Sequence, residues 1–226
     1  MKFIYYGHAC FEVEVNNKIL LFDPYISPNP LAKHIDIEKL KPDYILISHA
    51  HSDHIADAER IALNSGAALI SSFEVCKWFE KKGITKVHAL GIGGKKQFDF
   101  GTVKLVLAIH SSSFPDGSYG GNPGGFVITS PEKNFYYAGD TALTMDMQLI
   151  PSYADIAFAI LPIGDNFTAD YEDALEIAKM VKTKEVIGVH YNTFDLIKID
   201  TGEAQKHFSE NGTTLLLPAI GEVIEI

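Results

Sequence analysis

The chain has 226 residues, of which 46% are hydrophobic and 21% are charged, and this balance excludes a disordered chain. Its formal net charge is −10, because 29 acidic residues outnumber 19 basic ones, and such a chain repels the phosphate backbone of nucleic acids. We therefore expect a globular protein that has no nucleic-acid partner.

The first 25 residues predict a β-hairpin followed by a third strand. Residues 2–6 form a short apolar strand, and residues 10–15 alternate apolar and acidic side chains, which is typical of a half-buried strand. Asn16-Asn17 supplies the turn, and residues 19–22 form an apolar strand that ends at Asp23. The proline-rich segment that follows, 26–42, predicts a loop.

Strands and helices alternate from residue 44 onward, and strands outnumber helices by about two to one. The simplest packing for this alternation of strands and helices places the sheets inside and the helices outside. With no linker or repeat in the sequence, we expect one domain over residues 1–226. The predicted strands are 44–48, 68–71, 86–90, 103–109, 125–129, 135–138, 156–161, 186–189, 213–217 and 222–226, and the predicted helices are 55–64, 73–82, 170–182 and 203–210.

Four of the buried strands run directly into a histidine or an aspartate. These residues are His49, His110, Asp140 and His190. Strand ends in layered α/β proteins are where sites are assembled from residues distant in sequence. One such residue is ordinary, but four together predict convergence on one site.

The densest group of candidate ligands is the HxHxDH motif at residues 49–54. His49, His51 and His54 supply imidazoles and Asp53 supplies a carboxylate, all at a predicted strand-to-helix turn. These nitrogen and oxygen ligands suit zinc, manganese, iron or nickel. A polar loop with an Asp helix cap would explain any one of these residues, but it does not explain the whole set.

The HxHxDH motif resembles the signature of the metallo-β-lactamase superfamily, and His110, Asp140 and His190 follow in the order of its remaining metal motifs. Three further segments of the chain resemble one branch of this superfamily. That branch comprises small metal-dependent hydrolases related to ascorbate-phosphate lactonases and N-acylphosphatidylethanolamine phospholipases. The segments that match it are Gly7-His8-Ala9-Cys10-Phe11, Asp23-Pro24-Tyr25 and His190-Tyr191-Asn192-Thr193-Phe194.

This resemblance implies an α/β fold, namely a four-layer αββα sandwich with the metal site at one rim of the two sheets. It also implies two divalent ions per chain, with zinc preferred and manganese, nickel or iron as alternatives. Asp23 would support the site by hydrogen bonding to the HxHxDH turn. The implied ligands are His49, His51 and His110 for one ion and Asp53, His54 and His190 for the other, with Asp140 bridging.

The activity implied by the resemblance is hydrolysis of an ester, lactone or phosphoester in a small substrate. A hydroxide that bridges the two metals would be the nucleophile. Asp53 would orient it and carry its proton. His8, at a turn between two strands, is placed near the metals by the family motif, where it could donate to the leaving group or to the oxyanion.

The two cysteines form no CxxC pair, which fits a reducing compartment and excludes a disulfide framework or a thiolate zinc site. We expect Cys10 to pack in the core rather than to act as a nucleophile. No apolar run is long enough to span a bilayer, and no signal-peptide core precedes His8. These features predict a cytoplasmic protein, and a homo-oligomer is compatible with them.

Three alternative functions stay open at this stage. One is a phosphodiesterase that acts on a nucleotide or RNA, and another is a metal-binding regulatory module with little turnover. The third is a redox diiron site, since histidine and aspartate also suit iron. Among the remaining motifs, we interpret the glycine-rich segment 117–125 as a lid or substrate-contact loop, and His34, His88 and His207 as surface or loop residues.

Overall fold

The computed structural model describes the whole chain, residues 1–226. Its strands are β1 (Lys2–Gly7), β2 (Cys10–Val15), β3 (Lys18–Phe22), β4 (Tyr44–Leu46), β5 (Ala68–Ser72), β6 (Val87–Leu90), β7 (Lys95–Gln97), β8 (Thr102–Leu107), β9 (Gly124–Thr129), β10 (Phe135–Tyr137), β11 (Phe158–Pro162), β12 (Glu185–Val189), β13 (Thr214–Leu216) and β14 (Val223–Glu225). Its α-helices are α1 (Ser52–Ile55), α2 (Ala58–Ser65), α3 (Phe73–Lys81), α4 (Tyr171–Val181) and α5 (Thr201–Glu210), and its 3-10 helices are η1 (Ile37–Lys39), η2 (Met145–Ser152) and η3 (Asp195–Ile197).

The strands form two seven-stranded sheets, which we call sheet A and sheet B. Sheet A has the order β14-β1-β2-β3-β4-β5-β6, and sheet B has the order β13-β12-β11-β10-β9-β8-β7. Each sheet has an antiparallel half and a parallel half. In sheet A the pairing becomes parallel between β3 and β4, and in sheet B it becomes parallel between β10 and β11.

The two sheets pack face to face over a core of large apolar side chains. Phe11 and Phe22 of sheet A contact Tyr137 of sheet B, and all three side chains are buried. Alternate residues of the same strands point away from this core, because successive side chains of a strand lie on opposite faces. The core therefore fixes both the register and the spacing of the sheets.

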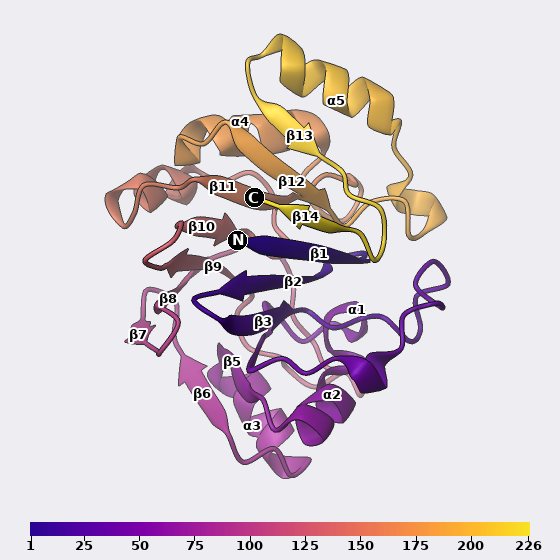
Figure 1. Cartoon of the computed structure of the whole chain (residues 1–226), viewed down its shortest axis with the longest axis vertical. Coiled ribbons are helices and arrows are strands. Elements are labelled where there is room, and N and C mark those ends of the chain that lie inside the picture. Colours follow the sequence, from indigo (N-terminus) through magenta and orange to yellow (C-terminus); the bar gives the residue numbers. More distant parts are fainter.

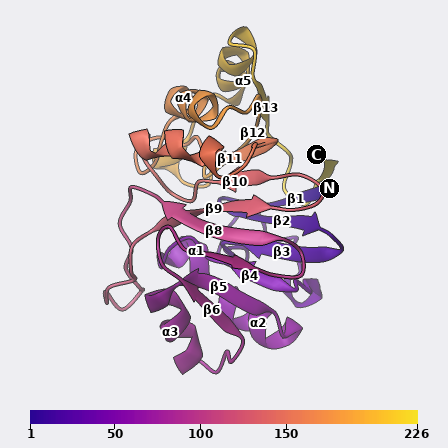
Figure 2. The same cartoon turned by 90° about the vertical axis from the view of Figure 1, so that its left-hand side faces the viewer.

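Helices cover the outer face of each sheet. Ile61 of α2 and Phe79 of α3 belong to the apolar cluster that covers sheet A, and Ile177 of α4 and Phe208 of α5 belong to the one that covers sheet B. Figures 1 and 2 show α2 and α3 at one end of the molecule and α4 and α5 at the other, with both sheets between them. The expected four-layer αββα sandwich is confirmed.

Most predicted elements are present with small shifts at their ends, but the predicted helix 55–64 is wrong. The chain instead forms α1 from Ser52, breaks at Asp57 and continues as α2. The Asp57 side chain explains the break, because it accepts hydrogen bonds from the backbone N–H groups of Ile26 and Ser27. His88, expected on the surface or in a loop, lies half-buried on β6.

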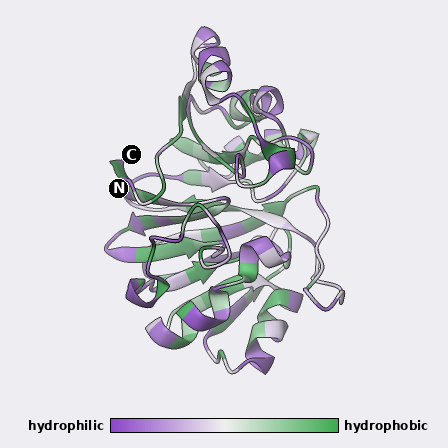
Figure 3. Cartoon of the chain, turned by 90° about the vertical axis from the view of Figure 1, so that its right-hand side faces the viewer, coloured by the Kyte–Doolittle hydropathy of each residue, from purple (hydrophilic) through white to green (hydrophobic).

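Several chain ends meet at one rim of the sandwich. The C-terminal ends of β1, β3 and β12 approach the right-hand side of Figure 1, which faces the viewer in Figure 3. In Figure 3 hydrophobic colour follows the strands, whereas much of the helix surface is hydrophilic. No helix in the structure is both long enough and apolar enough to cross a bilayer.

Candidate active site

The HxHxDH motif forms a turn between β4 and α2. His49 and His54 are fully buried, whereas His51 and Asp53 are partly exposed. His51 precedes the first residue of α1 in extended conformation, and Asp53 lies in the first turn of that helix. A short helix inside the motif therefore turns His54 inward and leaves Asp53 at the surface of the site.

The first group of facing ligand atoms comes from His49, His51 and His110. The Nε2 atom of His49 lies 2.9 Å from Nδ1 of His51, and the ring centre of His110 lies 5.1 Å from both other rings. One ligand atom from each residue lies within 4.8 Å of the other two. His110 stands three residues beyond the end of β8, so the strand stops earlier than the sequence predicted.

The second group comes from His8, Asp53, His54 and His190, whose ligand atoms also lie within 4.8 Å of one another. His190 directly follows β12. Asp140 lies between the two groups, because its Oδ2 atom is 3.0 Å from His190 Nε2, 3.2 Å from His54 Nε2 and 3.7 Å from His110 Nε2. We call these eight residues the His–Asp cluster: His8, His49, His51, Asp53, His54, His110, Asp140 and His190.

Asp23 lies beneath the cluster and fixes the orientation of two of its imidazoles. Its carboxylate accepts hydrogen bonds from the backbone N–H and the hydroxyl of Ser48, from His54 Nδ1 and from the Tyr137 hydroxyl. Since the Ser48 hydroxyl proton goes to Asp23, the Ser48 oxygen accepts from His49 Nδ1, at 2.9 Å. Asp23 therefore hydrogen bonds to the HxHxDH turn, as predicted from the sequence.

These hydrogen bonds decide which nitrogens are free to bind a cation. With Nδ1 of His49 and His54 engaged in these hydrogen bonds, Nε2 is the nitrogen of each ring that faces the centre of the cluster. Asp140 Oδ1 is buried and has no hydrogen-bond partner, and the buried His54 Nε2 has only the Asp140 carboxylate near it, at 3.2 Å. Buried polar atoms without partners are rare in proteins and need an explanation. The donor set therefore fits a metal ion.

The charge states of the first group also fit a metal ion. Burial lowers the pKa of His49, His51 and His110, and the nearby His54 charge adds to this effect. These rings are thus neutral at pH 7, which is the form that binds a metal. Burial also lowers the His54 pKa, but the carboxylates of Asp140 and Asp23 outweigh it and hold that pKa well above its ordinary value.

The two carboxylates of the cluster remain ionised. Burial raises the pKa of Asp140, but the charges of His190 and His54 outweigh it and hold the pKa well below its usual range. Burial likewise raises the Asp53 pKa, and His54 and a hydrogen bond from His8 outweigh it. The site therefore holds two negative charges among its imidazoles, as a divalent cation would require.

His8 lies inside the cluster with both ring nitrogens occupied. Its Nε2 is 3.0 Å from Asp53 Oδ2, and its Nδ1 is 3.1 Å from the hydroxyl of Thr193. Burial, assisted by the charge of His190, lowers the His8 pKa to about 4, so the ring is neutral at pH 7. Because the Asp53 carboxylate accepts, Nε2 carries the proton and Nδ1 accepts from Thr193.

The sequence predicted the position of Cys10 but not the roles of three supporting residues. Cys10 is fully buried, and burial raises its thiol pKa well above the ordinary value, so it packs in the core as expected. Ser48, Tyr137 and Thr193 were not predicted as site residues, since a hydroxyl that supports a histidine has no sequence pattern of its own.

The glycine-rich segment 117–125 lies against the HxHxDH turn. A Cβ atom on Gly120 would come within 2.3 Å of the Ala50 side chain, so only glycine fits there without displacement. The Ala50 N–H donates to the hydroxyl of Ser112, and the Ser112 carbonyl accepts from the Gly120 N–H, so Ser112 links this segment to the same turn. Gly124 and Gly125 belong to β9, so the loop ends before them.

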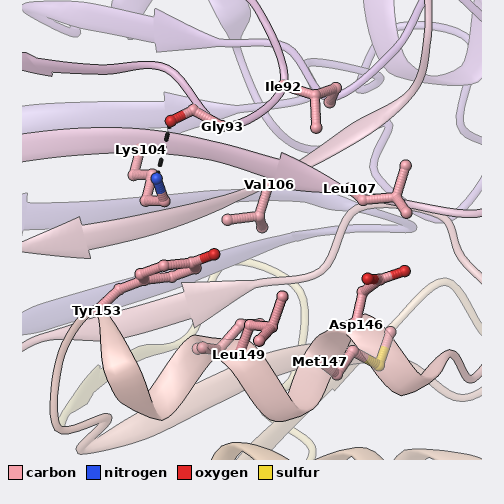
Figure 4. Close-up of a pocket in the computed structure, with 10 residues that line it drawn as sticks. Ile92, Gly93, Lys104, Val106, Leu107, Asp146, Met147, Leu149 and Tyr153 are labelled. Atoms are coloured by element: carbon pink, nitrogen blue, oxygen red, sulfur yellow. Dashed lines mark hydrogen bonds between the residues drawn. The ribbon is translucent and has the colours of Figure 1, made fainter.

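Two cavities differ in their relation to the cluster. One, of about 340 Å³, has His8 in its wall. The other, of about 220 Å³, lies between β8 and η2 and is drawn in Figure 4, where Lys104 and Tyr153 flank its apolar lining. None of its lining residues belongs to the His–Asp cluster. Only the first cavity is adjacent to the candidate chemistry.

Comparisons with known proteins agree on one family. Residues 2–190 match the model of the beta-lactamase superfamily domain. The chain is 51% identical over 226 residues to a UPF0173 metal-dependent hydrolase of Flavobacterium johnsoniae and 52% identical over 227 residues to one of Christiangramia forsetii, with full coverage of all chains.

One solved structure has the same fold as this chain. It is Igni18, a metallo hydrolase from the hyperthermophilic archaeon Ignicoccus hospitalis, with a TM-score of 0.89 and 35% sequence identity. The match covers 100% of this chain and 98% of that chain. The two proteins therefore share the sandwich over almost their whole length.

Proposed function

Since the chain belongs to the UPF0173 metal-dependent hydrolases of the beta-lactamase superfamily, we propose that its His–Asp cluster binds two divalent ions and hydrolyses an ester, lactone or phosphoester in a small substrate. The observation that carries this proposal is the set of inward-facing imidazole nitrogens whose orientation Asp23 fixes. Zinc is the preferred ion, because most of the ligand atoms are imidazole nitrogens.

Each ion has its own ligand group in this proposal. His49, His51 and His110 hold one ion, and Asp53, His54 and His190 hold the other, with Asp140 between them. The support is geometric, because the ligand atoms of each histidine group lie within 4.8 Å of one another and Asp140 Oδ2 lies within 4.0 Å of imidazoles from both.

When bound, the ions would lower the pKa of a water molecule and polarise the bond to be cleaved. The residues of this chain do the rest. The Asp53 side chain is 27% exposed whereas that of Asp140 is 3% exposed, so only Asp53 can exchange a proton with solvent. We assign to Asp53 the transfer of a proton from the attacking water to the leaving group.

His8 positions Asp53 in this proposal. Its neutral ring donates from Nε2 to one Asp53 oxygen, while Thr193 fixes the opposite nitrogen. The other Asp53 oxygen is thereby free to face an ion or a substrate proton. Both catalytic residues expected from the sequence, Asp53 and His8, thus keep a role, although His8 acts through Asp53 rather than on the leaving group.

The cellular setting and the substrate belong to the same proposal. Cys10 and Cys76 are buried and free, which suits a reducing cytoplasm. The substrate is a small molecule, since the cavity beside the cluster has a volume of about 340 Å³.

Metal content and turnover test the proposal together. Protein loaded with zinc and freed of excess metal should contain close to two ions per chain by mass spectrometry. His110→Ala and His190→Ala should each retain close to one. The loaded wild type should hydrolyse at least one member of a panel of chromogenic phosphodiesters, lactones and thioesters. Saturation below one ion per chain, or no turnover on the whole panel, would contradict the proposal.

A further inference from the structure

The cavity next to the cluster is a cleft between the ends of both sheets and the start of α5. Twelve residues line it, and they come from segments far apart in the sequence. Tyr5 stands at its sheet A side and Tyr191 at its sheet B side, with Leu217 and Ile220 from the segment between β13 and β14. We call this cavity the His8 cleft.

The His8 cleft and the His–Asp cluster share one wall. His8 lines the cleft and also contacts Asp53, and Thr193, which holds the other side of the His8 ring, lines the cleft as well. The His8 backbone is held firmly, because its carbonyl accepts hydrogen bonds from the Tyr5 hydroxyl and from the backbone N–H of His190. A substrate that reaches Asp53 and extends past His8 therefore enters this cleft.

The lining of the His8 cleft contains polar groups but no charge. None of the twelve residues is a lysine, arginine, aspartate or glutamate. His8 is the one imidazole among them, and its Nε2 is hydrogen bonded to the Asp53 carboxylate outside the lining. The polar groups are the hydroxyls of Tyr191, Thr193 and Thr201 and the amides of Asn192 and Gln205.

These features select for an uncharged group. A carboxylate or phosphate placed in the cleft would lose hydration without gaining a counter-charge, whereas a hydroxyl or an amide would find hydrogen-bond partners. The apolar part of the lining suits a flat ring. The volume, about 340 Å³, is at the small end of ligand pockets and favours a single ring rather than a long chain.

We propose that the His8 cleft binds the leaving-group portion of the substrate and that this portion is an uncharged ring with hydroxyl, amide or similar polar substituents. This inference rests on the proposed function, in which Asp53 returns the proton to the leaving oxygen. Water adds its hydroxyl to the acyl carbon, the bond from that carbon to the leaving oxygen breaks, and the proton ends on that oxygen. The ring attached to that oxygen then lies beyond His8.

A matched pair of product-like phenols tests the charge selection. 4-(Methylsulfonyl)phenol and 4-hydroxybenzenesulfonate are similar in shape and differ by one negative charge, and neither substituent is a strong zinc ligand. Binding of each to the zinc-loaded enzyme is measured by titration calorimetry or by NMR at low ionic strength. We expect the neutral sulfone to bind at least about tenfold more tightly than the sulfonate.

A positive charge placed in the cleft should weaken this preference. Gln205 lines the cleft from the exposed surface of α5, so Gln205→Lys should reduce the ratio of the two affinities by about tenfold or more. Gln148→Lys is the matched control, because Gln148 is an exposed glutamine on η2 that does not line the cleft. This control should keep the ratio of the wild type.

The possible results separate this inference from the proposed function. Equal affinities in the wild type, no binding of either phenol, or equal effects of the two lysine variants would overturn the cleft assignment, even if the acetate esters of the phenols are hydrolysed. Selective binding whose affinity ratio falls about tenfold in Gln205→Lys, and not in Gln148→Lys, supports it. Selective binding without hydrolysis of either acetate, or of any other ester, would overturn the leaving-group role and the proposed function together.

Discussion

The two carboxylates of the His–Asp cluster occupy different environments, and the difference supports the roles proposed for them. Asp140 is buried and touches imidazoles from both ligand groups, so its oxygens are suited to hold ions in place. Asp53 lies at the start of α1, reaches solvent and is held by His8. A proton carrier needs access to water, which only Asp53 has.

Asp53→Asn should lower kcat by a factor of about 10²–10⁴ on a responsive substrate and change KM far less. The amide keeps an oxygen that can contact an ion, but it loses the charge and the basic oxygen. The measurement must compare wild type and variant at equal metal occupancy. Cys10→Ala is the control and should stay near wild type, because that thiol is buried and far from ionisation. The reverse pattern would indicate thiol chemistry.

His8 gives the metal-free protein a predictable response to acid. Its pKa is 6.5 in the unfolded chain and about 4 in the folded one, so between these values the unfolded state binds the additional proton. The contribution of His8 to the free energy of unfolding is therefore highest above pH 6.5 and falls as the pH decreases toward 4. One such group contributes a slope of at most about 1.4 kcal/mol per pH unit.

His8→Gln should therefore flatten the pH dependence of stability in that window. The remaining slope comes from the other buried histidines, such as His49, whose pKa burial also lowers. Urea unfolding with a chelator present, repeated from pH 7 to pH 4, measures both proteins. If the slope were the same in both, then His8 would not be neutral in the folded state.

At the scale of elements, the site depends on loops that glycine allows to approach closely. Gly120 lies against Ala50, between the two histidines His49 and His51. Gly120→Ala should push this turn away and weaken zinc binding by about 10–100-fold, as loss of a supporting contact does in other metal sites. Competition with a chromophoric chelator measures this affinity.

A second glycine serves as the control for this loop prediction. Gly91→Ala places its Cβ where nothing lies within 4 Å, so zinc affinity should stay unchanged. Equal affinities for the Gly120→Ala and Gly91→Ala proteins would show that the glycine-rich loop does not support the HxHxDH turn.

The elements that could be predicted from sequence are those with a strong apolar period. Strand β2 and helix α4 were placed to within one residue, because each buries one face of a regular pattern. Strand β7, Lys95-Lys96-Gln97, was missed because all three side chains are exposed and the strand exists only through pairing with β8. Helix η2 was missed because Pro151 lies within it.

All eight members of the cluster were predicted, but most of the contacts that orient them were not. Histidine and aspartate at strand ends are visible in sequence, and the structure brings all of them together. The choice of ring nitrogen is set by partners such as Thr193 and Ser48, and the contact between His8 and Thr193 joins residues 185 positions apart. Contacts of that range arise from the packing of whole sheets.

At the scale of the whole molecule, Asp23 joins both sheets and the site. Asp23 directly follows β3 of sheet A. It accepts a hydrogen bond from Tyr137, which belongs to β10 of sheet B. The same carboxylate orients His54 and, through Ser48, His49. Stability of the sandwich and geometry of the cluster therefore depend on one buried group.

Tyr137→Phe should show this coupling in two measurements. The change removes one donor from a buried carboxylate and should lower the free energy of unfolding by about 2 kcal/mol. It should also lower zinc affinity by up to about tenfold, because Asp23 then holds His54 less firmly. Urea unfolding of the metal-free protein and chelator competition measure the two effects.

Tyr136→Phe is the control for the Tyr137→Phe prediction. Tyr136 follows Phe135 on the same strand and is equally buried, but its side chain faces the helices and its hydroxyl has no hydrogen-bond partner. Tyr136→Phe removes an unsatisfied polar atom, so the free energy of unfolding should stay the same or rise, and zinc affinity should not change. If both variants lost the same free energy of unfolding, the loss would come from the packing of the ring. The hydrogen bond between Tyr137 and Asp23 would then not stabilise the contact between the sheets.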